Sequence, residues 1–488
     1  KKKRMILYDL IIVGAGITGL SAARYLSKHH PEIKFKILEA RDRVGGRTLN
    51  QTVSLPLSSD KDSDYLTTII DIGGQWIGPT QKNIHELIQQ LEGNNNSSVF
   101  IEQTWATRKD KYAGQPGLYE ALRVKSLTME EEQEVIEMNK RLDQMALEIP
   151  SVQEPFKDCA MAKEWDQISV GEYLEKNVQQ KNSLQALFLE IITLTACNPD
   201  RVSLLYWLIL LRSVPGGYVL LDDGLNGAQH YRLKNGAQNI SILMANELKN
   251  QYGSDVIQFS QPVTSVRYHD SLLTLTTVSS CQQYATHRLF LAMSPTLLKS
   301  IQFTPSLPLD YQKLSVTMFM GHCIKTIFIY KIPFWRRHDR QPKQVEDALR
   351  GPVYNIYEID LHDQMYYALT GLIDGDLAKY WCKRSEHELT TSIIAQYQYL
   401  YNSQEIPIKT IVQYWPNEQF SGGCYAAVFP PNGLSQYGSV LRKPIQFDGS
   451  KNPNIWIAST ETALEWISYM AGALEAGERT IKEIIKTI

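Results

Sequence analysis

The sequence predicts an α/β fold, in which a Rossmann-like dinucleotide-binding domain is interleaved with an α+β domain that binds substrate. The first observation is the stretch 10–48, where an apolar run, a glycine-rich turn, a helical pattern and a second apolar run follow one another. This is the order of a βαβ unit that holds a dinucleotide. The second is that helical and strand-like segments recur along the rest of the 488 residues, a length that suffices for two domains.

The glycines of the turn have the spacing Gly14-x-Gly16-x-x-Gly19. Gly14 permits the tight turn, Gly16 lets the backbone approach a pyrophosphate, and Gly19 lets the helix pack closely on the strand. Glu39 follows Gly19 by 20 residues, where a carboxylate accepts hydrogen bonds from a ribose hydroxyl. Three glycines alone would also suit a cofactor-free protein, but the flanking strand, helix and acid favour a dinucleotide site.

The composition and the cysteine pattern exclude several function classes. Lys and Arg total 50 against 52 Asp and Glu, so no global field attracts nucleic acid or an anionic membrane. The six cysteines form no CxxC pair, which predicts neither a metal site nor a disulfide framework. Reduced thiols in a cytosol-facing compartment are expected.

The first 20 residues imitate a secretory signal, because four basic residues precede an apolar run. The glycine turn lies inside that run, and cleavage would destroy the predicted dinucleotide site, so we reject a signal peptide. The longest apolar run, 204–211, is too short to span a bilayer.

Hydrophobic periodicity and turn residues place the remaining elements. Residues 50–68 are polar and serine-rich, and we expect a loop there. Helices are expected over 83–91, 129–145, 171–177, 184–195, 202–212, 240–248, 386–401 and 469–486. Strands are expected over 69–72, 263–266, 272–278, 288–293, 321–330, 366–373, 410–414 and 455–458. Linkers or turns are expected at 93–98, 216–229 and 421–431.

Three positions stand out for chemistry. Cys424 follows two glycines, which let the backbone approach a ligand, although a lone cysteine is more often a small buried hydrophobe. Lys325 interrupts an apolar strand, so either this edge is solvated or the ammonium has a task. Gly73 and Gly74 precede Trp76, an arrangement that suits backbone lying against a flat ring or an ordinary turn.

Six segments together resemble one family, the flavin-containing monoamine oxidases of the flavin amine oxidase superfamily: 14–19, 38–48, 71–81, 333–336, 415–431 and 460–479. The most discriminating is Ser-Gly-Gly-Cys-Tyr at 421–425, followed by Phe-Pro-Pro at 429–431. Arg41, Gly46 and Arg47 resemble a second fingerprint that wraps the FAD diphosphate, which indicates FAD rather than a nicotinamide dinucleotide. The resemblance weakens over 54–68, 109–127 and 337–351.

The resemblance implies a fold of the glutathione-reductase type with two discontinuous domains. The FAD-binding domain would comprise residues 1–92, 236–311 and 436–488, and the substrate-binding domain residues 93–235 and 312–435.

The resemblance also implies roles for single residues. Cys424 would carry FAD covalently through an 8α-S-cysteinyl bond, Lys325 would hold a water beside the flavin N5, and Tyr425 and Tyr469 would stand on either side of the substrate path. Further cofactor contacts are implied for Gly74, Gln75, Trp76, Val263, Trp415, Thr460 and Met470.

The same resemblance places three residues at the substrate cavity. Gln229 matches a cavity glutamine, Leu372 replaces a cavity aromatic, and Asp222 falls where relatives have an apolar gate. Ser459 replaces a glycine in the C-terminal flavin-contacting segment, which we expect to be tolerated.

The implied reaction is oxidative deamination of primary amines to aldehyde, ammonia and hydrogen peroxide, with dioxygen as oxidant and no metal. Hydride transfer and an amine–flavin adduct remain alternative mechanisms. A diamine oxidase of the putrescine type is an alternative function, which Asp222 would favour if it faced the cavity. An L-amino-acid oxidase, which would need an arginine for the substrate carboxylate, and a non-catalytic flavoprotein are further alternatives. A homodimer, and an anchor after Ile488 to the mitochondrial outer membrane, stay open.

Overall fold

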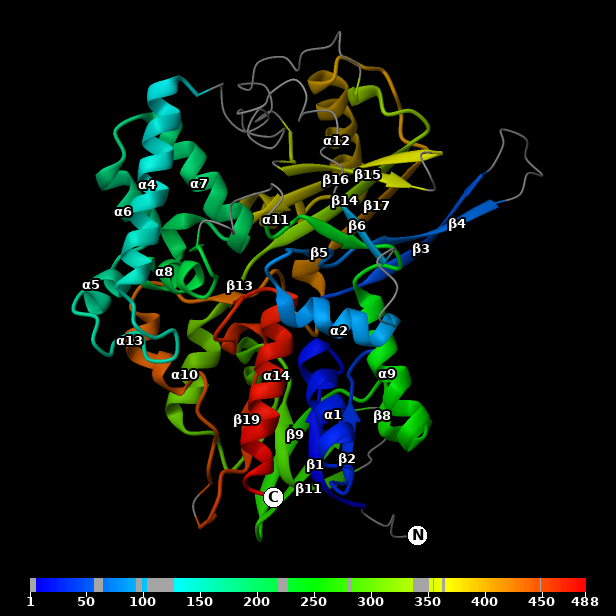
Figure 1. Ribbon diagram of the computed structural model, residues 1–488, viewed down its shortest axis with the longest axis vertical. Coiled ribbons are helices and arrows are strands. Elements are labelled where there is room, and N and C mark those ends of the chain that lie inside the picture. The colour runs from blue at the N-terminus through cyan, green and yellow to red at the C-terminus, as the bar shows by residue number, and fades with distance from the viewer. Residues whose placement is uncertain are drawn as a thin grey trace.

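Two large sheets organise the chain in the computed structural model (Figure 1). The structure describes residues 6–56, 65–93, 99–102, 127–217, 227–278, 283–336, 351–353, 355–361, 365–447 and 449–488. In these ranges one sheet has eight strands and the other four, and smaller groups pair β13 with β18, β3 with β4, and β5 and β6 with β7.

The eight-stranded sheet is built around β1, which lies between β2 and β11 and is parallel to both. Its strand order is β12-β9-β10-β11-β1-β2-β8, and β19 also pairs with β11. The strands are β1 (Leu7–Val13), β2 (Phe35–Leu38), β8 (Ile257–Gln258), β9 (Val263–His269), β10 (Leu272–Thr277), β11 (Gln283–Leu291), β12 (Gln302–Thr304) and β19 (Ile455–Ile457). Because the centre of the sheet is buried on both faces, β1 ends in the apolar run 10–13 and every residue of β2 is buried, Lys36 included.

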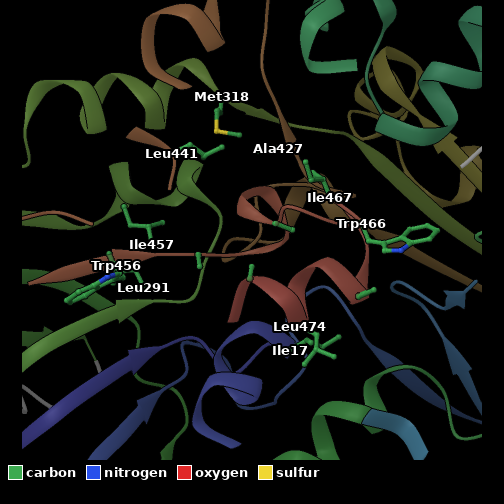
Figure 2. Packing of buried hydrophobic residues seen from close by; sticks show 14 of the residues in the cluster. Ile17, Leu291, Met318, Ala427, Leu441, Trp456, Ile457, Trp466, Ile467 and Leu474 are labelled. Atoms are coloured by element: carbon green, nitrogen blue, oxygen red, sulfur yellow. The ribbon is translucent and has the colours of Figure 1, made fainter. Parts of the chain in front are cut away.

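Helix α1 (Ile17–His29) packs against α14 (Met470–Ile485) and α9 (Gln238–Tyr252), so the two ends of the chain meet on this sheet (Figure 1). Figure 2 shows Ile17 of α1 and Leu474 of α14 at this junction, and Leu291, Trp456 and Ile457 on strands belong to the same core cluster. A side chain at Gly477 of α14 would come within 2.3 Å of the Thr18 carbonyl oxygen. The close approach of the two helices therefore requires a glycine.

The four-stranded sheet has the order β15-β16-β14-β17 and is antiparallel throughout. Its strands are β14 (Cys323–Tyr330), β15 (Asn355–Leu361), β16 (Tyr366–Asp374) and β17 (Lys409–Tyr414). On one face Phe328 packs against α12 (Glu386–Leu400), and on the other Ile327 packs against β3 and β4. Every residue of β14 is buried, which identifies it as an interior strand.

The prediction of a loop over residues 50–68 is wrong. Residues on both sides of the undescribed 57–64 form an antiparallel pair, β3 (Asn50–Pro56) and β4 (Tyr65–Asp71). Val53, Leu55 and Ile70 point into the core of the four-stranded sheet, while intervening positions such as Thr52 and Ser54 face solvent. The period-2 alternation of a half-buried strand was hidden by the polar composition of its outer face.

Four helices, α4, α6, α7 and α8, group together on one side of the molecule, at the upper left of Figure 1. These are α4 (Met129–Leu147), α6 (Val170–Asn177), α7 (Lys181–Thr195) and α8 (Leu204–Arg212). The apolar run 204–211 is fully buried in α8. Among the described helices, none combines the length and apolar character needed to cross a bilayer.

The shorter elements complete the fold. They are α2 (Lys82–Glu92), α5 (Ala162–Gln167), α10 (Leu309–Thr317), α11 (Gly375–Trp381), α13 (Gly433–Tyr437), β5 (Trp76–Ile77), β6 (Phe100–Glu102), β7 (Tyr231–Leu233), β13 (Phe319–Met320) and β18 (Ala427–Val428). The helices and strands expected from periodicity all form, with ends that differ by a few residues. The strand β15, the helices α5, α10, α11 and α13, and the short strands β6, β7, β8, β12, β13 and β18 were not expected; β18 lies within the turn expected over 421–431.

Candidate active site

A cavity of about 440 Å³ is lined by residues of both large sheets. One end is formed by the glycine turn after β1 and by the segments that follow β2. The other reaches Lys325 on β14, Leu372 on β16 and the segment that contains Cys424. A dinucleotide site and a set of reactive side chains therefore share one continuous space.

The three glycines of the turn differ in the way the sequence predicts. Gly14 has a φ of +110°, and a side chain there would lie 2.6 Å from the Ala292 carbonyl oxygen. A side chain at Gly19 would lie 2.0 Å from the Gly14 carbonyl oxygen, so this glycine serves packing and does not line the cavity. At Gly16 the nearest atom would be 3.9 Å away, and this glycine opens onto the cavity.

Glu39 lies at the edge of the same space and is almost fully buried. Its carboxylate accepts hydrogen bonds from the backbone N–H groups of Ala15 (2.6 Å) and Arg41 (2.9 Å). These bonds tie the end of the second strand to the glycine turn and fix the carboxylate beside the predicted ribose position.

The arginines of the second fingerprint connect it to the cysteine segment. Arg41 donates to Glu418 (3.0 Å) and to the Ser421 hydroxyl (2.9 Å). Arg47 forms two parallel bonds with Glu461 (2.9 and 3.0 Å) and donates to the Tyr425 carbonyl oxygen (2.8 Å). Both arginines, together with Gly46, line the cavity.

Glu461 is a site residue that the sequence reasoning missed. Its carboxylate also accepts hydrogen bonds from the Ala427 N–H (3.1 Å) and from the Ser459 hydroxyl (2.6 Å). Burial alone would raise the pKa of Glu461, but the charge and hydrogen bonds of Arg47 outweigh burial and lower it. The Ser459 side chain, which we expected to be tolerated, is thus accommodated by this acid.

Lys325 is buried on the interior strand β14, so the solvated-edge interpretation is wrong. Its ammonium donates to the Gly73 carbonyl oxygen (2.9 Å) and to the Gln75 Oε1, and it lies 5.4 Å from the Trp76 ring centre. Burial lowers the pKa of Lys325, and the same effect raises the pKa of nearby Asp71. Asp71, which the sequence reasoning passed over, is held by the Ala237 N–H (2.8 Å).

The segment that contains Cys424, residues 421–425, lies close to the backbone of Gly321, just before β14. Gly423 has a φ of +138°, and a side chain there would lie 2.2 Å from the Gly321 carbonyl oxygen. That same oxygen accepts a hydrogen bond from the Cys424 N–H (3.0 Å). Cys424 is buried and lines the cavity, as does Trp415, whose indole N–H donates to the Ile72 carbonyl oxygen (3.0 Å).

Aromatic rings line the cavity beside these groups. The Tyr425 hydroxyl donates to the buried Asp374, and the Tyr469 ring packs edge-on against Trp466 at 5.3 Å. The Thr460 hydroxyl donates to the Tyr469 carbonyl oxygen (2.9 Å). Tyr357 on β15, which follows a region of weak resemblance, supplies a further ring and was missed.

The remaining predicted residues are placed as follows. Gln229, Leu372, Val263 and Met470 line the cavity. The Gln229 Oε1 is buried and has no hydrogen-bond partner in the described part of the chain. Asp222 lies outside the described residues, so its place at the gate stays a prediction.

A flat polar cofactor fits this cavity. A side chain at Gly74 would meet no atom within 4 Å, so the backbone there faces open space. The buried Gln75 Nε2 lacks a partner among the described residues. An open glycine next to an unpaired amide provides both room and a donor for the heteroatoms of a ring such as a flavin. The described residues contain no group of three or more His, Cys, Asp or Glu side chains that could hold a metal ion.

The fold and this cavity define a flavin-dependent oxidoreductase, and comparison with known proteins identifies the family. The family of flavin containing amine oxidoreductases matches residues 17–485. A probable flavin-containing monoamine oxidase A of Dictyostelium discoideum is 32% identical over 98% of this chain and 97% of its own length. The flavin-containing amine oxidase B of Mus musculus is 30% identical over 98% of this chain and 86% of its own length. The chain therefore belongs to the flavin-containing amine oxidoreductases, enzymes that carry a flavin and act on amines.

Solved structures agree in fold. A putrescine oxidase bound to putrescine has a TM-score of 0.80 at 24% identity, over 99% of this chain and 100% of that one. The cyclohexylamine oxidase of Brevibacterium oxydans has a TM-score of 0.77 at 22% identity, over 98% of this chain and 99% of that one. At this identity the likeness concerns the fold alone.

Proposed function

We propose that this protein is an FAD-dependent oxidase of primary monoamines, which yields aldehyde, ammonia and hydrogen peroxide. The observation that carries the proposal is the continuity of the cavity. The glycine turn that would hold the FAD phosphates lines the same space as Tyr425 and Tyr469, and Lys325 and Cys424 line it too. The relatives named monoamine oxidase favour this substrate class over diamines.

The protein residues would orient and desolvate the amine. When bound, the flavin supplies the two-electron oxidation and passes the electrons on to dioxygen. Tyr425, Tyr469 and Tyr357 line the space with ring faces and edges, and Leu372 adds an apolar wall that excludes water. The neutral amine is the form that is oxidised, and an apolar wall favours that form once the amine is enclosed.

Lys325 would hold a water near the reacting atoms. Two of the three donors of the Lys325 ammonium are used by Gly73 and Gln75, and Lys325 is one of the residues that line the cavity. Since the lowered pKa of Lys325 brings its proton closer to exchange at neutral pH, the group suits proton delivery during reoxidation.

We further propose that Cys424 carries the FAD covalently through its sulfur. The glycines before it bring the segment against the cavity, and the Ser-Gly-Gly-Cys-Tyr motif of the family supports the assignment. The neighbouring Cys323 lines the same cavity, but burial raises its pKa well above the usual range and keeps it a thiol. The thiolate is the reactive form, so Cys323 is the matched control for Cys424.

The domain division is also kept as a proposal. Residues 1–92, 236–311 and 436–488 would bind FAD, and residues 93–235 and 312–435 would bind the amine. A cytosol-facing location and a homodimer remain predictions.

Anaerobic mixing of the flavin-loaded protein with amines tests the proposed reaction. We expect benzylamine to bleach the flavin and, in air, to release peroxide faster than putrescine or leucine. A clear preference for putrescine would favour a diamine oxidase, and a preference for leucine an amino-acid oxidase. A flavin that no amine bleaches would overturn the proposal in favour of a non-catalytic flavoprotein.

Acid precipitation tests the covalent bond. We expect a yellow pellet from the wild type and from Cys323→Ala, and a colourless pellet with free FAD from Cys424→Ala. A colourless wild-type pellet would refute covalent attachment.

A further inference from the structure

At the hydroxyl end of the Tyr425 ring lies a buried acid that no catalytic role yet explains. Asp374 is the last residue of β16 and is 1% exposed. Its two carboxylate oxygens lie 3.2 and 3.3 Å from the Tyr425 hydroxyl oxygen. Tyr425 lines the cavity and Asp374 does not, so any effect of this acid on a ligand acts through the phenol.

The orientation of Asp374 is not explained by its place in the fold. It occupies the N-cap position of α11, where an aspartate usually accepts a hydrogen bond from the first turn of the helix. No such side-chain bond forms at this helix, and the carboxylate instead receives the Tyr425 hydroxyl. The carboxylate therefore contacts a residue of the cavity wall and does not cap the helix.

The phenol is the donor in this contact. Burial, and then the charge of Asp374, raise the pKa of Tyr425 well above its usual range, so the hydroxyl stays protonated. Burial and the neighbouring Asp374 also raise the pKa of the Cys323 thiol. A hydrogen-bond donor stabilises the ionised form of a carboxylate, and the Tyr425 hydroxyl is such a donor. A hydroxyl that donates to a carboxylate leaves more electron density on its ring.

We propose that Asp374 is a positioning residue that makes the Tyr425 wall selective for a positively charged head group. It fixes the phenol and strengthens the negative potential of the ring face, so the cavity binds an ammonium group more tightly than a neutral group of the same shape. An ion above an aromatic face is held by the ring quadrupole, and a negative charge at the hydroxyl end of the ring adds to that attraction. The inference rests on the proposed function only in taking the ligand to be an amine.

The test compares two ligands of the same shape, one charged and one neutral. Phenyltrimethylammonium carries a permanent charge that pH cannot remove, and tert-butylbenzene is its neutral isostere. Each is titrated into the flavin-loaded protein, and binding is followed by the change in flavin absorbance, which requires no turnover.

Removing the charge of Asp374 should weaken the binding of the cation and not that of the neutral ligand. We expect Asp374→Asn to raise the dissociation constant of phenyltrimethylammonium about three- to tenfold and to leave that of tert-butylbenzene within about twofold. Tyr425→Phe removes the donor while the acid remains, and it should cause a similar selective loss. The double variant should lose no more than the larger single loss, because the two residues act as one unit.

Asp376→Asn is the matched control. Asp376 lies two residues further on and pairs with Lys379 at the surface (2.7 Å), so it carries the same charge outside the cavity wall. An equal loss in this variant would overturn the proposal in favour of a general field. An unchanged ratio of cation to neutral affinity in Asp374→Asn, or an equal weakening of both ligands, would reduce Asp374 to a structural role.

The outcome is separable from that of the proposed function. Peroxide release from benzylamine by the wild type decides whether the protein oxidises monoamines. The ratio of the two affinities decides the role of Asp374, whichever amine is oxidised.

Discussion

Replacement of Glu461 by glutamine should destabilise the protein and loosen the cysteine segment. The Glu461 side chain is fully buried, and Arg47, its partner, is 26% exposed. The Glu461→Gln variant keeps the shape of the side chain but removes its charge. It leaves a guanidinium without a counter-ion and puts an N–H group where Arg47, Ala427 and Ser459 all supply donors.

The size of the effect follows from the geometry. Breaking a buried ion pair by removal of one partner costs about 3–5 kcal/mol, and the partial exposure of Arg47 lets water recover some of it. We therefore expect a loss of about 2–3 kcal/mol in the free energy of unfolding. With an unfolding entropy of about 2.1 cal/mol/K per residue over 488 residues, this corresponds to about 2–3 °C in melting temperature.

The pH dependence supplies a second test of the same pair. The folded-state pKa of Glu461 is lowered, so its contribution is present above the unfolded pKa and is lost as pH falls through the folded pKa. The difference in the free energy of unfolding between wild type and Glu461→Gln should be constant from pH 7 to about pH 5 and should become smaller at lower pH.

Thermal melts at pH 7 and at acid pH measure the loss of stability and its pH dependence. The amount of flavin retained in the acid-precipitated pellet measures the loosening of the cysteine segment. The control is Glu154→Gln, which breaks an exposed pair with Lys157 (3.8 Å) and should change stability by less than about 0.5 kcal/mol. Because Arg47 also holds the Tyr425 carbonyl oxygen, less flavin should be retained in Glu461→Gln. A melting temperature equal to that of the control would refute the reasoning.

Three further predictions concern two cavity residues and a histidine next to β14. Lys325→Met should keep FAD bound but slow flavin reoxidation about 100-fold in stopped-flow measurements, and wild-type rates would remove the lysine from the mechanism. Gly74→Val should leave the melting temperature of the flavin-free protein unchanged while the bound flavin falls, because the new side chain enters open space; full flavin content would contradict the placement of the ring. Burial lowers the pKa of His322 to about 4, so the neutral imidazole contributes stability above pH 6.5 that is lost as pH falls towards 4. In urea denaturation, His322→Asn should reduce the loss of unfolding free energy on acidification by about 1–2 kcal/mol. If the loss is the same as in the wild type, other groups cause the pH dependence.

The βαβ unit and the glycine roles were predictable because each depends on neighbours within a few residues. Local hydrophobic periodicity indicates the strand, the turn and the helix. Gly14 and Gly19 make the close backbone contacts that the spacing of the motif predicts. The assembly of the cavity was not predictable in this way. Lys325, Cys424 and Tyr469 come from segments far apart in the sequence, and only the resemblance to a family placed them together.

The partners of these residues were missed for a physical reason. Glu461, Asp71 and Asp374 carry no local pattern, since each is explained by a group more than 40 residues away. The loop expected over 50–68 failed similarly, because β3 becomes a strand only when Val53 and Leu55 meet Ile327 of the other sheet.

The alternation of β14 shows how one strand serves both the core and the chemistry. Successive side chains of a strand point to opposite faces, so Phe328 packs under α12 while Ile327 and Ile329 pack against β3 and β4. Lys325 has the same parity as Ile327 and Ile329, which directs its ammonium to the face where the Gly73–Gln75 turn follows β4. A shift of one residue in register would bury the charge under α12, and the apolar residues of β14 on both sides of the lysine oppose that shift. The packing that holds the strand in place therefore also holds the lysine at the cavity.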